Sequence, residues 1–373
     1  MIPVFRPSFD EEEIDALREP FATGWVGTGP KTKEFEERFG AFIGVPHAVA
    51  VNSCTSALYL TLRAANVEGG EVIAPAMTFV ATNHAIIAAK ATPAFADIEA
   101  HTLNVDPADV VQRITPRTRA VIAMHYGGHS CRLDELLDVT RAHRIPLIED
   151  CAHATGGLYK QRPLGSIGAF GCFSFQAIKN VATGDGGMIT LKDAGVAERL
   201  RRMTWLGISR DTWARSSSGR YNWEYDVTEF ELKYQMNDIA AAIGLVQLRK
   251  LGRTNARRRA LAMRYTAALE GIDGYETPRE EPYTQSSWHN YVIKVTRAEW
   301  RDRLVDFLRS REIAAGVHYM PTHLYRIYEP YRVSLPITEE VWQRVVTLPL
   351  FPDLSDADQD RVVSALRDFR RQV

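Results

Sequence analysis

From His47 onward, short apolar runs alternate with longer amphipathic segments. The apolar runs are typical of buried strands and cover residues 48–53, 71–75, 93–97, 119–125 and 146–151. The segments between them carry apolar residues at helical spacing, most clearly at 54–66, 78–90 and 133–143. This alternation predicts an α/β fold with a mostly parallel sheet and helices on both faces. Ligands of such sheets bind beyond the carboxyl ends of the strands, so the residues that follow each run are the candidates for a site.

One stretch, Gly171 to Gly187, places a lysine between two predicted strands. It reads GCFSFQAIKNVATGDGG, and the next run, residues 188–191, again predicts a strand. The apolar residues before Lys179 indicate burial, and the turn-forming residues after it indicate a tight connection. Lysine is rarely buried without a partner. It is either a surface residue of the connection or a nucleophile that forms a Schiff base with an aldehyde.

Composition excludes several classes of protein. The 373 residues suffice for about two domains, and the formal net charge of −1 favours neither nucleic acid nor an anionic membrane as partner. The four cysteines, Cys54, Cys131, Cys151 and Cys172, form no CxxC pair, which argues against a zinc site or a disulfide scaffold. We expect no metal site. No apolar run reaches about 18 residues and no signal pattern opens the chain, so we expect a soluble, cytoplasmic protein.

The pattern changes after a long irregular segment at 205–235, whose aromatic residues argue against disorder. A helix is predicted from Asn237 towards Leu269. Beyond it, the predicted elements are strand 291–295, helix 301–310, a strand near 317–319 and a helix from Asp356. We therefore predict a large domain, residues 1–250, and a smaller α+β domain, residues 251–373.

Two carboxyl-end positions carry candidate chemistry. Asp150 closes an apolar strand 29 residues before Lys179. A carboxylate there either caps a loop or holds the protonated ring nitrogen of pyridoxal 5′-phosphate (PLP), with the lysine attaching the cofactor. Residues 52–56 join a strand to a helix start, where backbone N–H groups bind phosphate, although Ser and Thr are also ordinary helix caps.

Several single residues remain open between a site role and a structural role. Ser174 ends its strand and could donate to a phosphate, and Phe79 could stack on a flat ring or pack in the core. His125 and His153 could bind a phenolic oxygen or serve as buried structural histidines. Residues that could contact a substrate are His323, Trp288 and the 205–235 segment.

Taken together, the motifs resemble the sugar aminotransferases of the DegT/DnrJ/EryC1/StrS family. The matching pieces are VNSCTSALYL, VIAPAMTFVAT, HYGGHSCRLDEL, PLIEDCAHATGGLYKQRPLGSIGAFGCFSF and AIKNVATGDGG, with a weaker GVHYMPTH at 316–323. They follow one another along nearly the whole chain. The resemblance implies a fold-type I, PLP-dependent enzyme, aspartate aminotransferase-like, that acts as a homodimer with shared active sites.

The resemblance also implies individual roles. Lys179 matches the lysine that attaches the cofactor and catalyses proton transfer, and Asp150 matches the aspartate at the ring nitrogen. The remaining matches are His153 beside the ring oxygen, Phe79 over the ring face, and the phosphate ligands Thr55, Ser56 and Ser174. The segment LKYQMNDI, residues 232–239, matches the part that reaches into the partner subunit's site, with Lys233 as the candidate phosphate ligand.

The function implied is transfer of an amino group, with glutamate as donor, to the 3- or 4-keto group of a nucleoside-diphosphate keto-deoxysugar. A keto-cyclitol aminotransferase and a non-catalytic regulatory protein of the same fold are the alternatives. A dehydratase is disfavoured, because relatives with that activity replace the lysine that Lys179 retains.

Overall fold

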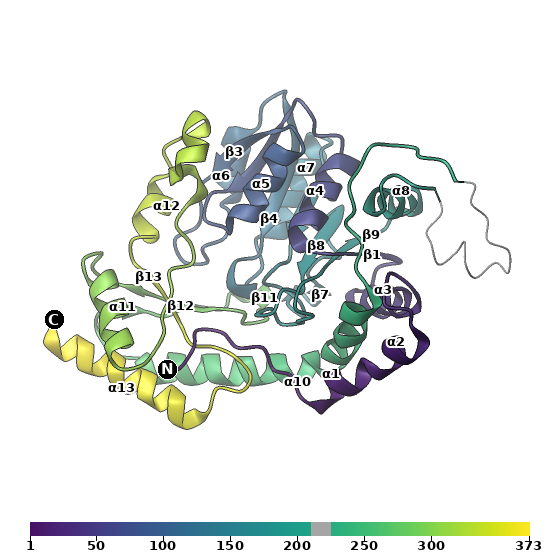
Figure 1. Ribbon diagram of the computed structural model, residues 1–373. Coiled ribbons are helices and arrows are strands. Elements are labelled where there is room, and N and C mark those ends of the chain that lie inside the picture. The colour runs from purple at the N-terminus through teal and green to yellow at the C-terminus, as the bar shows by residue number, and fades with distance from the viewer. Residues whose placement is uncertain (210–224) are drawn as a thin grey trace.

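The computed structural model describes residues 1–209 and 225–373 (Figure 1). Its centre is a seven-stranded sheet of order β1-β9-β8-β5-β4-β2-β3. The strands are β1 (His47–Val51), β2 (Glu71–Pro75), β3 (Thr92–Ala96), β4 (Thr118–Met124), β5 (Leu147–Asp150), β8 (Phe170–Ser174) and β9 (Gly187–Leu191). Strand β9 runs antiparallel to both neighbours, and the remaining pairings are parallel. The predicted mostly parallel sheet is confirmed.

Helices bury both faces of this sheet (Figure 1). One face packs against α4 (Cys54–Ala64), α5 (Val80–Ala88) and α8 (Ala194–Thr204). The other packs against α3 (Pro30–Ile43), α6 (Pro107–Arg113), α7 (Leu133–Ala142) and the start of α10 (Asp238–Leu269). Within β4, Val121 belongs to one core and Ile122 to the other, as the alternation of side chains along a strand requires.

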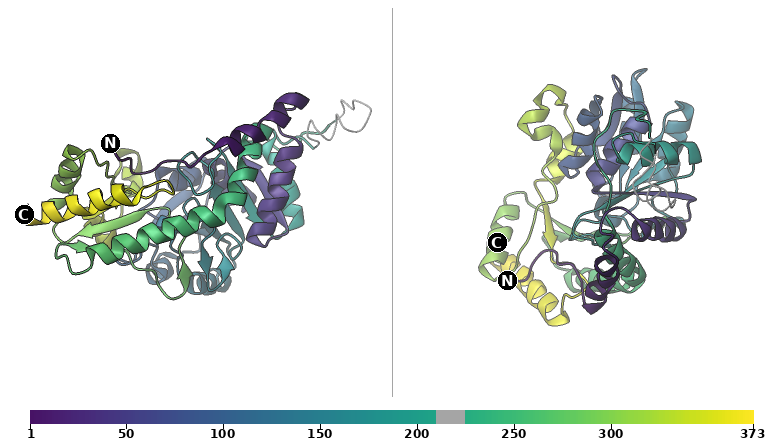
Figure 2. Two further views of the ribbon diagram at one scale, coloured as in Figure 1. Left: turned by 90° about the horizontal axis from the view of Figure 1, so that it is seen from below. Right: turned by 45° about the vertical axis from the view of Figure 1, so that its right-hand side comes forward.

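Helix α10 connects the sheet with the C-terminal part. Its 32 residues extend about 48 Å at the usual helical rise, and Figure 2 shows it passing from beneath the sheet towards α13 (Asp356–Gln372). Asn237 caps the helix, and Asp238 ties it to α3 by accepting from the backbone N–H groups of Gly29 and Thr32. The helix runs unbroken through residue 250, where we predicted the boundary between the two domains. The division into domains at this residue stays a prediction.

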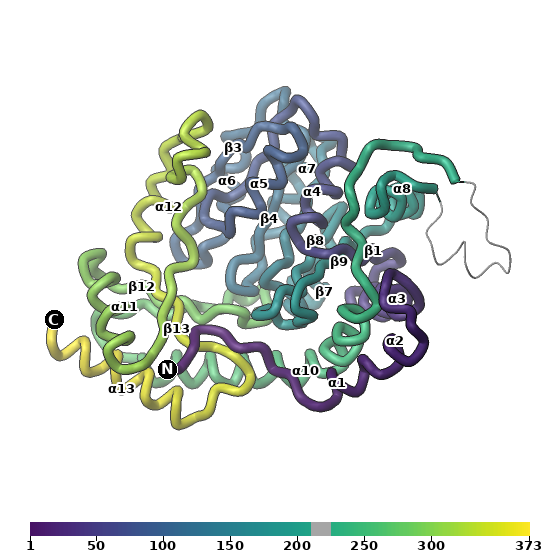
Figure 3. The backbone as a smooth tube through the Cα atoms, viewed as in Figure 1, coloured from purple at the N-terminus to yellow at the C-terminus, as the bar shows by residue number. Residues whose placement is uncertain are grey.

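The C-terminal part is built on a second, antiparallel sheet of β10 (Tyr275–Glu276), β12 (Tyr291–Val295) and β13 (Val345–Leu348). Helices α11 (Trp300–Ser310), α12 (Pro336–Val341) and α13 surround it, with short turns η2 (Thr322–Leu324) and η3 (Arg326–Tyr331). A third sheet joins β11 (Thr284–Gln285) to β6 (Leu158–Tyr159) and β7 (Arg162–Pro163). The N-terminal residues lie along this part (Figure 3), because Ile2 exchanges backbone hydrogen bonds with Glu312 and Ala314.

Three local predictions need comment. The strand predicted near 317–319 is wrong: these residues form an irregular segment, and the preceding Gly316 bridges to Thr347 of β13. The helix that the sequence predicts from Glu11 to Glu19 divides at Leu17 into α1 (Glu11–Ala16) and α2 (Arg18–Thr23). In the predicted 205–235 loop, residues 210–224 lie outside the described residues.

Across the described part of the chain, we find no helix with the length and apolar character needed to cross a membrane.

Candidate active site

A cavity of about 450 Å³ opens at the carboxyl edge of the central sheet. Four strand ends supply its wall: Ser53 to Thr55 follow β1, Thr78 and Phe79 follow β2, Asp150 to His153 end β5, and Ser174 to Lys179 leave β8. His318 and Tyr319 reach the cavity from the C-terminal part, in the irregular segment found where a strand was predicted. The lining is completed by Leu58, Ala81, Thr82, Met124 at the end of β4, Asp185 and Gly186. The convergence follows from the parallel sheet, because its strands end at a common edge.

Lys179 lies in the connection between β8 and β9, as predicted. The connection is closed by backbone hydrogen bonds from Phe175 to Gly186 and from Thr183 to Phe175. Gly187 lets it approach the start of α4, since a Cβ at this position would stand 2.6 Å from the carbonyl carbon of Ser53. Burial lowers the pKa of Lys179 to about 8, against smaller opposing effects of Cys54 and Asp150. The amine is therefore a better nucleophile near neutral pH than an exposed lysine.

Asp150 faces the same cavity and is only 2% exposed. Its Oδ2 accepts from the Thr82 hydroxyl at 2.8 Å, and its Oδ1 accepts from the backbone N–H of Ala152 at 3.1 Å. Burial raises the pKa of this carboxyl, while these two bonds and the Lys179 charge act in the opposite direction. A carboxylate held in this way gains from a cationic partner, which makes it suited to a protonated heteroatom.

His153 and Phe79 also line the cavity. Gly127 donates its backbone N–H to His153 Nδ1 at 3.3 Å, so in the neutral ring the proton is on Nε2, which faces the Tyr319 hydroxyl at 3.0 Å. Burial lowers the pKa of His153 well below its ordinary value, which keeps the ring neutral. Phe79 precedes α5 and is 57% exposed, so its ring face is open to a ligand in the cavity.

The predicted phosphate ligands divide into two groups. Thr55 and Ser174 line the cavity, next to the N-terminus of α4. The Ser56 hydroxyl instead donates to Asn52 Oδ1 at 2.6 Å and is not among the lining residues. Lys233 lies apart from this cavity, 4.9 Å from the Trp205 ring, beside the segment of residues 24–28.

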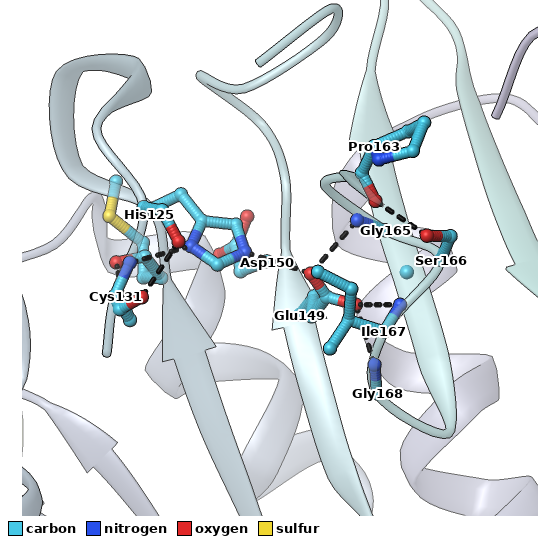
Figure 4. A network of polar contacts seen from close by, with 12 residues as sticks. His125, Cys131, Glu149, Asp150, Pro163, Gly165, Ser166, Ile167 and Gly168 are labelled. Carbon is cyan, nitrogen blue, oxygen red and sulfur yellow. Dashed lines mark hydrogen bonds and ion pairs between the residues drawn. The ribbon is translucent and has the colours of Figure 1, made fainter. Parts of the chain in front are cut away.

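A buried polar network supports the strand that carries Asp150 (Figure 4). Glu149 accepts backbone N–H bonds from Gly165, Ile167 and Gly168 at 2.7–2.9 Å, and its Oε2 is 3.1 Å from His125 Nε2. Cys131 donates its N–H to His125 Nδ1, so Nε2 carries the proton that Glu149 accepts. His125, Glu149 and Cys151 are close enough to hold a metal ion, but these bonds already use the histidine and the carboxylate. His125 is therefore a structural histidine.

We expect Glu149→Gln to lower the free energy of unfolding by about 2–4 kcal/mol, because an NH₂ group would face backbone N–H donors in a buried site. Denaturant unfolding of the full chain measures this change. The matched control is Glu198→Gln, which removes a carboxylate that is 75% exposed and paired with Arg202, and should change the value by less than about 0.5 kcal/mol. Equal effects of the two substitutions would contradict the structural role of Glu149.

Sequence reasoning missed part of the site. Thr82 lies in the first turn of α5, and Tyr319 lies in an irregular segment expected to be a strand, so neither followed a recognised strand end. His289 contacts Lys179, with Nε2 3.5 Å from Nζ, yet it precedes β12 in the C-terminal part. Of the suggested substrate contacts, Trp288 belongs to the C-terminal core and His323 packs against Phe95, so neither lines the cavity.

A buried amine and a buried carboxylate in one cavity at the edge of a mostly parallel sheet are typical of fold-type I aminotransferases. A model of the DegT/DnrJ/EryC1/StrS aminotransferase family matches residues 7–367. The spore coat polysaccharide biosynthesis protein SpsC of Bacillus subtilis (strain 168) is 40% identical over 377 residues, covering 99% of this chain and 97% of SpsC.

Solved structures agree with this match. The aminotransferase TlmJ from Streptoalloteichus hindustanus superposes with a TM-score of 0.94 at 37% identity, over 100% of this chain and 99% of TlmJ. Spr1654 from Streptococcus pneumoniae is solved in PLP and PMP forms, and the PMP form gives a TM-score of 0.94 at 32% identity over 100% of both chains. The chain belongs to the DegT/DnrJ/EryC1/StrS aminotransferase family. The predicted fold class and the prediction of a PLP-dependent aminotransferase are confirmed at the level of the family.

Proposed function

We propose that this protein transfers an amino group, with L-glutamate as donor, to the 3- or 4-keto group of a nucleoside-diphosphate keto-deoxysugar. The observation that carries the proposal is that the Lys179 amine and the Asp150 carboxylate line one cavity with Phe79 and His153. The name of SpsC and the sugar aminotransferases among the similar structures support a sugar acceptor.

The residues present fit PLP. When bound, PLP supplies an aldehyde that condenses with amines and a ring that takes up an electron pair. Lys179, with a pKa of about 8, is unprotonated in about a tenth of molecules at pH 7 and can attack the aldehyde. Asp150 would hold the ring nitrogen in its protonated form. Thr55, Ser174 and the N-terminus of α4 would hold the phosphate, and the exposed face of Phe79 would cover the ring.

Proton transfer falls to Lys179. Its Nζ, once free, would be placed to take the proton from the α-carbon of the amino donor and to give it back as general acid. The reverse sequence delivers the amine to the keto acceptor. Neutral His153 directs its Nε2–H at the Tyr319 hydroxyl, so this pair can serve a phenolic oxygen without adding a charge.

The test separates donor from acceptor. The PLP-loaded protein mixed with L-glutamate alone should release about one 2-oxoglutarate per chain, and adding the acceptor should make release catalytic. A panel of 3-keto and 4-keto nucleotide sugars and a keto-cyclitol identifies the acceptor. Turnover with the keto-cyclitol alone would favour that alternative, and no release of 2-oxoglutarate would favour a regulatory protein of the same fold.

We also propose a homodimer in which Lys233 completes the partner's site. Lys233 is exposed and stands beside two apolar side chains that are themselves exposed, Phe230 at 87% and Leu232 at 57%. Such a surface is typical of an interface. Lys233 is not among the residues that line its own subunit's cavity, so we assign its charge to the phosphate site of the partner subunit.

Mixed dimers test the shared site. Lys179→Ala should abolish activity and Lys233→Ala should weaken PLP binding at least about tenfold, through loss of a charged phosphate contact. A dimer of one chain of each kind retains one intact site, so random exchange of subunits should restore about a quarter of wild-type activity at limiting PLP. Mixing Lys179→Ala with Lys179→Ala is the control. Absence of restoration after proven subunit exchange would exclude Lys233 from the shared site.

A further inference from the structure

His289 lies against the Lys179 amine but belongs to neither the predicted site nor the four strand ends. Its Nε2 is 3.5 Å from Lys179 Nζ, and the residue is 1% exposed. We infer that His289 is a positioning residue for Lys179. The unprotonated Nε2 of His289 accepts a hydrogen bond from Lys179 Nζ and so fixes the direction of the amine lone pair. The inference rests on the proposed function of Lys179 and adds a second residue to it.

The hydrogen bonds of Asn180 decide which nitrogen of His289 carries the proton. Asn180 Nδ2 donates to Asn255 Oδ1 at 2.8 Å and to the Ser287 carbonyl at 2.9 Å, which uses both of its hydrogens. Its Oδ1 is 3.2 Å from His289 Nδ1 and can only accept, so Nδ1 carries the proton. The lone pair of the neutral ring is therefore on Nε2, on the side of Lys179. Asn255 is held in turn, because its Nδ2 donates to the Thr155 carbonyl.

The imidazole has little freedom to turn away. Its ring stacks on Phe5 with centroids 5.4 Å apart and an interplanar angle of 3°, and it packs against the tilted His153 ring with centroids 4.4 Å apart and an angle of 30°. Three separated parts of the chain therefore hold one ring: the N-terminal segment, the loop after β5, and the turn that carries Asn180. A ring clamped in this way can define the position of Nζ, which a flexible lysine stem does not define by itself.

The ring also stays neutral. Burial is the main cause that lowers the pKa of His289 well below its ordinary value, and the charged or titratable groups around it act in the same direction. These groups are Lys179, His153, Arg258 and His318. A neutral imidazole can accept from either protonation state of Lys179. When Nζ is a free amine, an N–H directed at Nε2 turns its lone pair away from His289, which is the arrangement that proton abstraction needs.

Two matched substitutions test this role. His289→Phe keeps a flat ring for the stack and removes the acceptor. His289→Gln also loses the bond to Asn180, but its Oε1 reaches about as far as Nε2 and restores an acceptor. Both variants share the cost to Asn180, and His289→Gln also lacks the ring, so any recovery in His289→Gln relative to His289→Phe reports the bond to Lys179. If His289→Phe fails to fold, His289→Met provides a smaller apolar side chain for the same comparison.

The main readout is the pKa of the Lys179 amine in the cofactor-free full chain, from competitive acetylation across pH with mass spectrometry of the peptide that contains Lys179. We expect about 8 in the wild type, a value lower by about 1 in His289→Phe, and a value within about 0.3 of wild type in His289→Gln. The direction follows because the lost acceptor stabilised the ammonium form.

Kinetics of the PLP-loaded protein give the second readout. His289→Phe should lower kcat about tenfold with KM for the amino donor changed less than about twofold, and His289→Gln should recover most of kcat. Equal Lys179 pKa values and equal kcat in the two variants would overturn the inference. Failure of the proposed function is a different result, namely wild-type protein whose Lys179 shows the expected pKa but transfers no amine.

Discussion

Lys179→Arg is expected to lower the rate of amino transfer by at least about a thousandfold. Arginine keeps a long cationic side chain in the connection between β8 and β9, but its guanidinium stays protonated at every pH at which the protein folds. It can neither attack the aldehyde of PLP nor take a proton from the amino donor. Both tasks fall on one nitrogen in our proposal, so its loss stops both half-reactions.

Borohydride reduction gives a readout that does not depend on activity. Reduction of the PLP-loaded wild type should attach the cofactor permanently to the peptide that contains Lys179 and fix the yellow colour to the protein. The Lys179→Arg variant should carry no such adduct. Lys192→Arg, an exposed lysine just after β9, is the matched control and should behave as wild type. An unchanged spectrum and rate in Lys179→Arg would contradict the assignment of this lysine.

The strands of the central sheet were predictable because each is buried on both faces. Strand β2 is buried at every residue, and the corresponding apolar run, residues 71–75, has the same limits as the strand. Helices α4, α5 and α7 likewise fall within one to two residues of the predicted segments. The strand expected near 317–319 failed because Val317 and Tyr319 are apolar for another reason: they pack beside Met77 and Tyr126 where the two parts of the chain meet.

In the candidate site, too, some residues were predictable from the sequence and others were not. Asp150 and Lys179 were predictable because the topology of a parallel sheet brings strand ends together, whatever their separation in sequence. Residues that reach the cavity from the C-terminal part were not, since no local pattern tells which turn of a second sheet faces the first. His289 illustrates this, because it lies 110 residues from Lys179, and its neighbours in sequence, Trp288 and Tyr291, pack into the C-terminal core. Only the family resemblance pointed to the weaker motif that contains Tyr319.

Asp150→Asn should lower the rate about 100- to 1,000-fold while leaving the fold intact. The loss follows because a neutral amide cannot hold a proton on the ring nitrogen, and the ring then takes up an electron pair poorly. The fold should survive because Asn Oδ1 can still accept from Ala152. The amide nitrogen would face the Thr82 hydroxyl, which can accept and turn its own hydrogen to the Thr78 hydroxyl, 2.8 Å away.

The stability of the cofactor-free variant distinguishes this electrostatic role from a structural one. Burial raises the pKa of Asp150 above 3.8, so the folded state binds the proton more tightly than the unfolded chain does. Stability therefore falls as pH rises through the raised pKa, and the ionised group costs stability at pH 7 until a cation faces it. Asp150→Asn removes this cost, so thermal unfolding at pH 7 without PLP should show a midpoint equal to or above that of wild type. A lower midpoint together with lost activity would mean that Asp150 supports the loop after β5, and that its carboxylate is not reserved for a protonated ring.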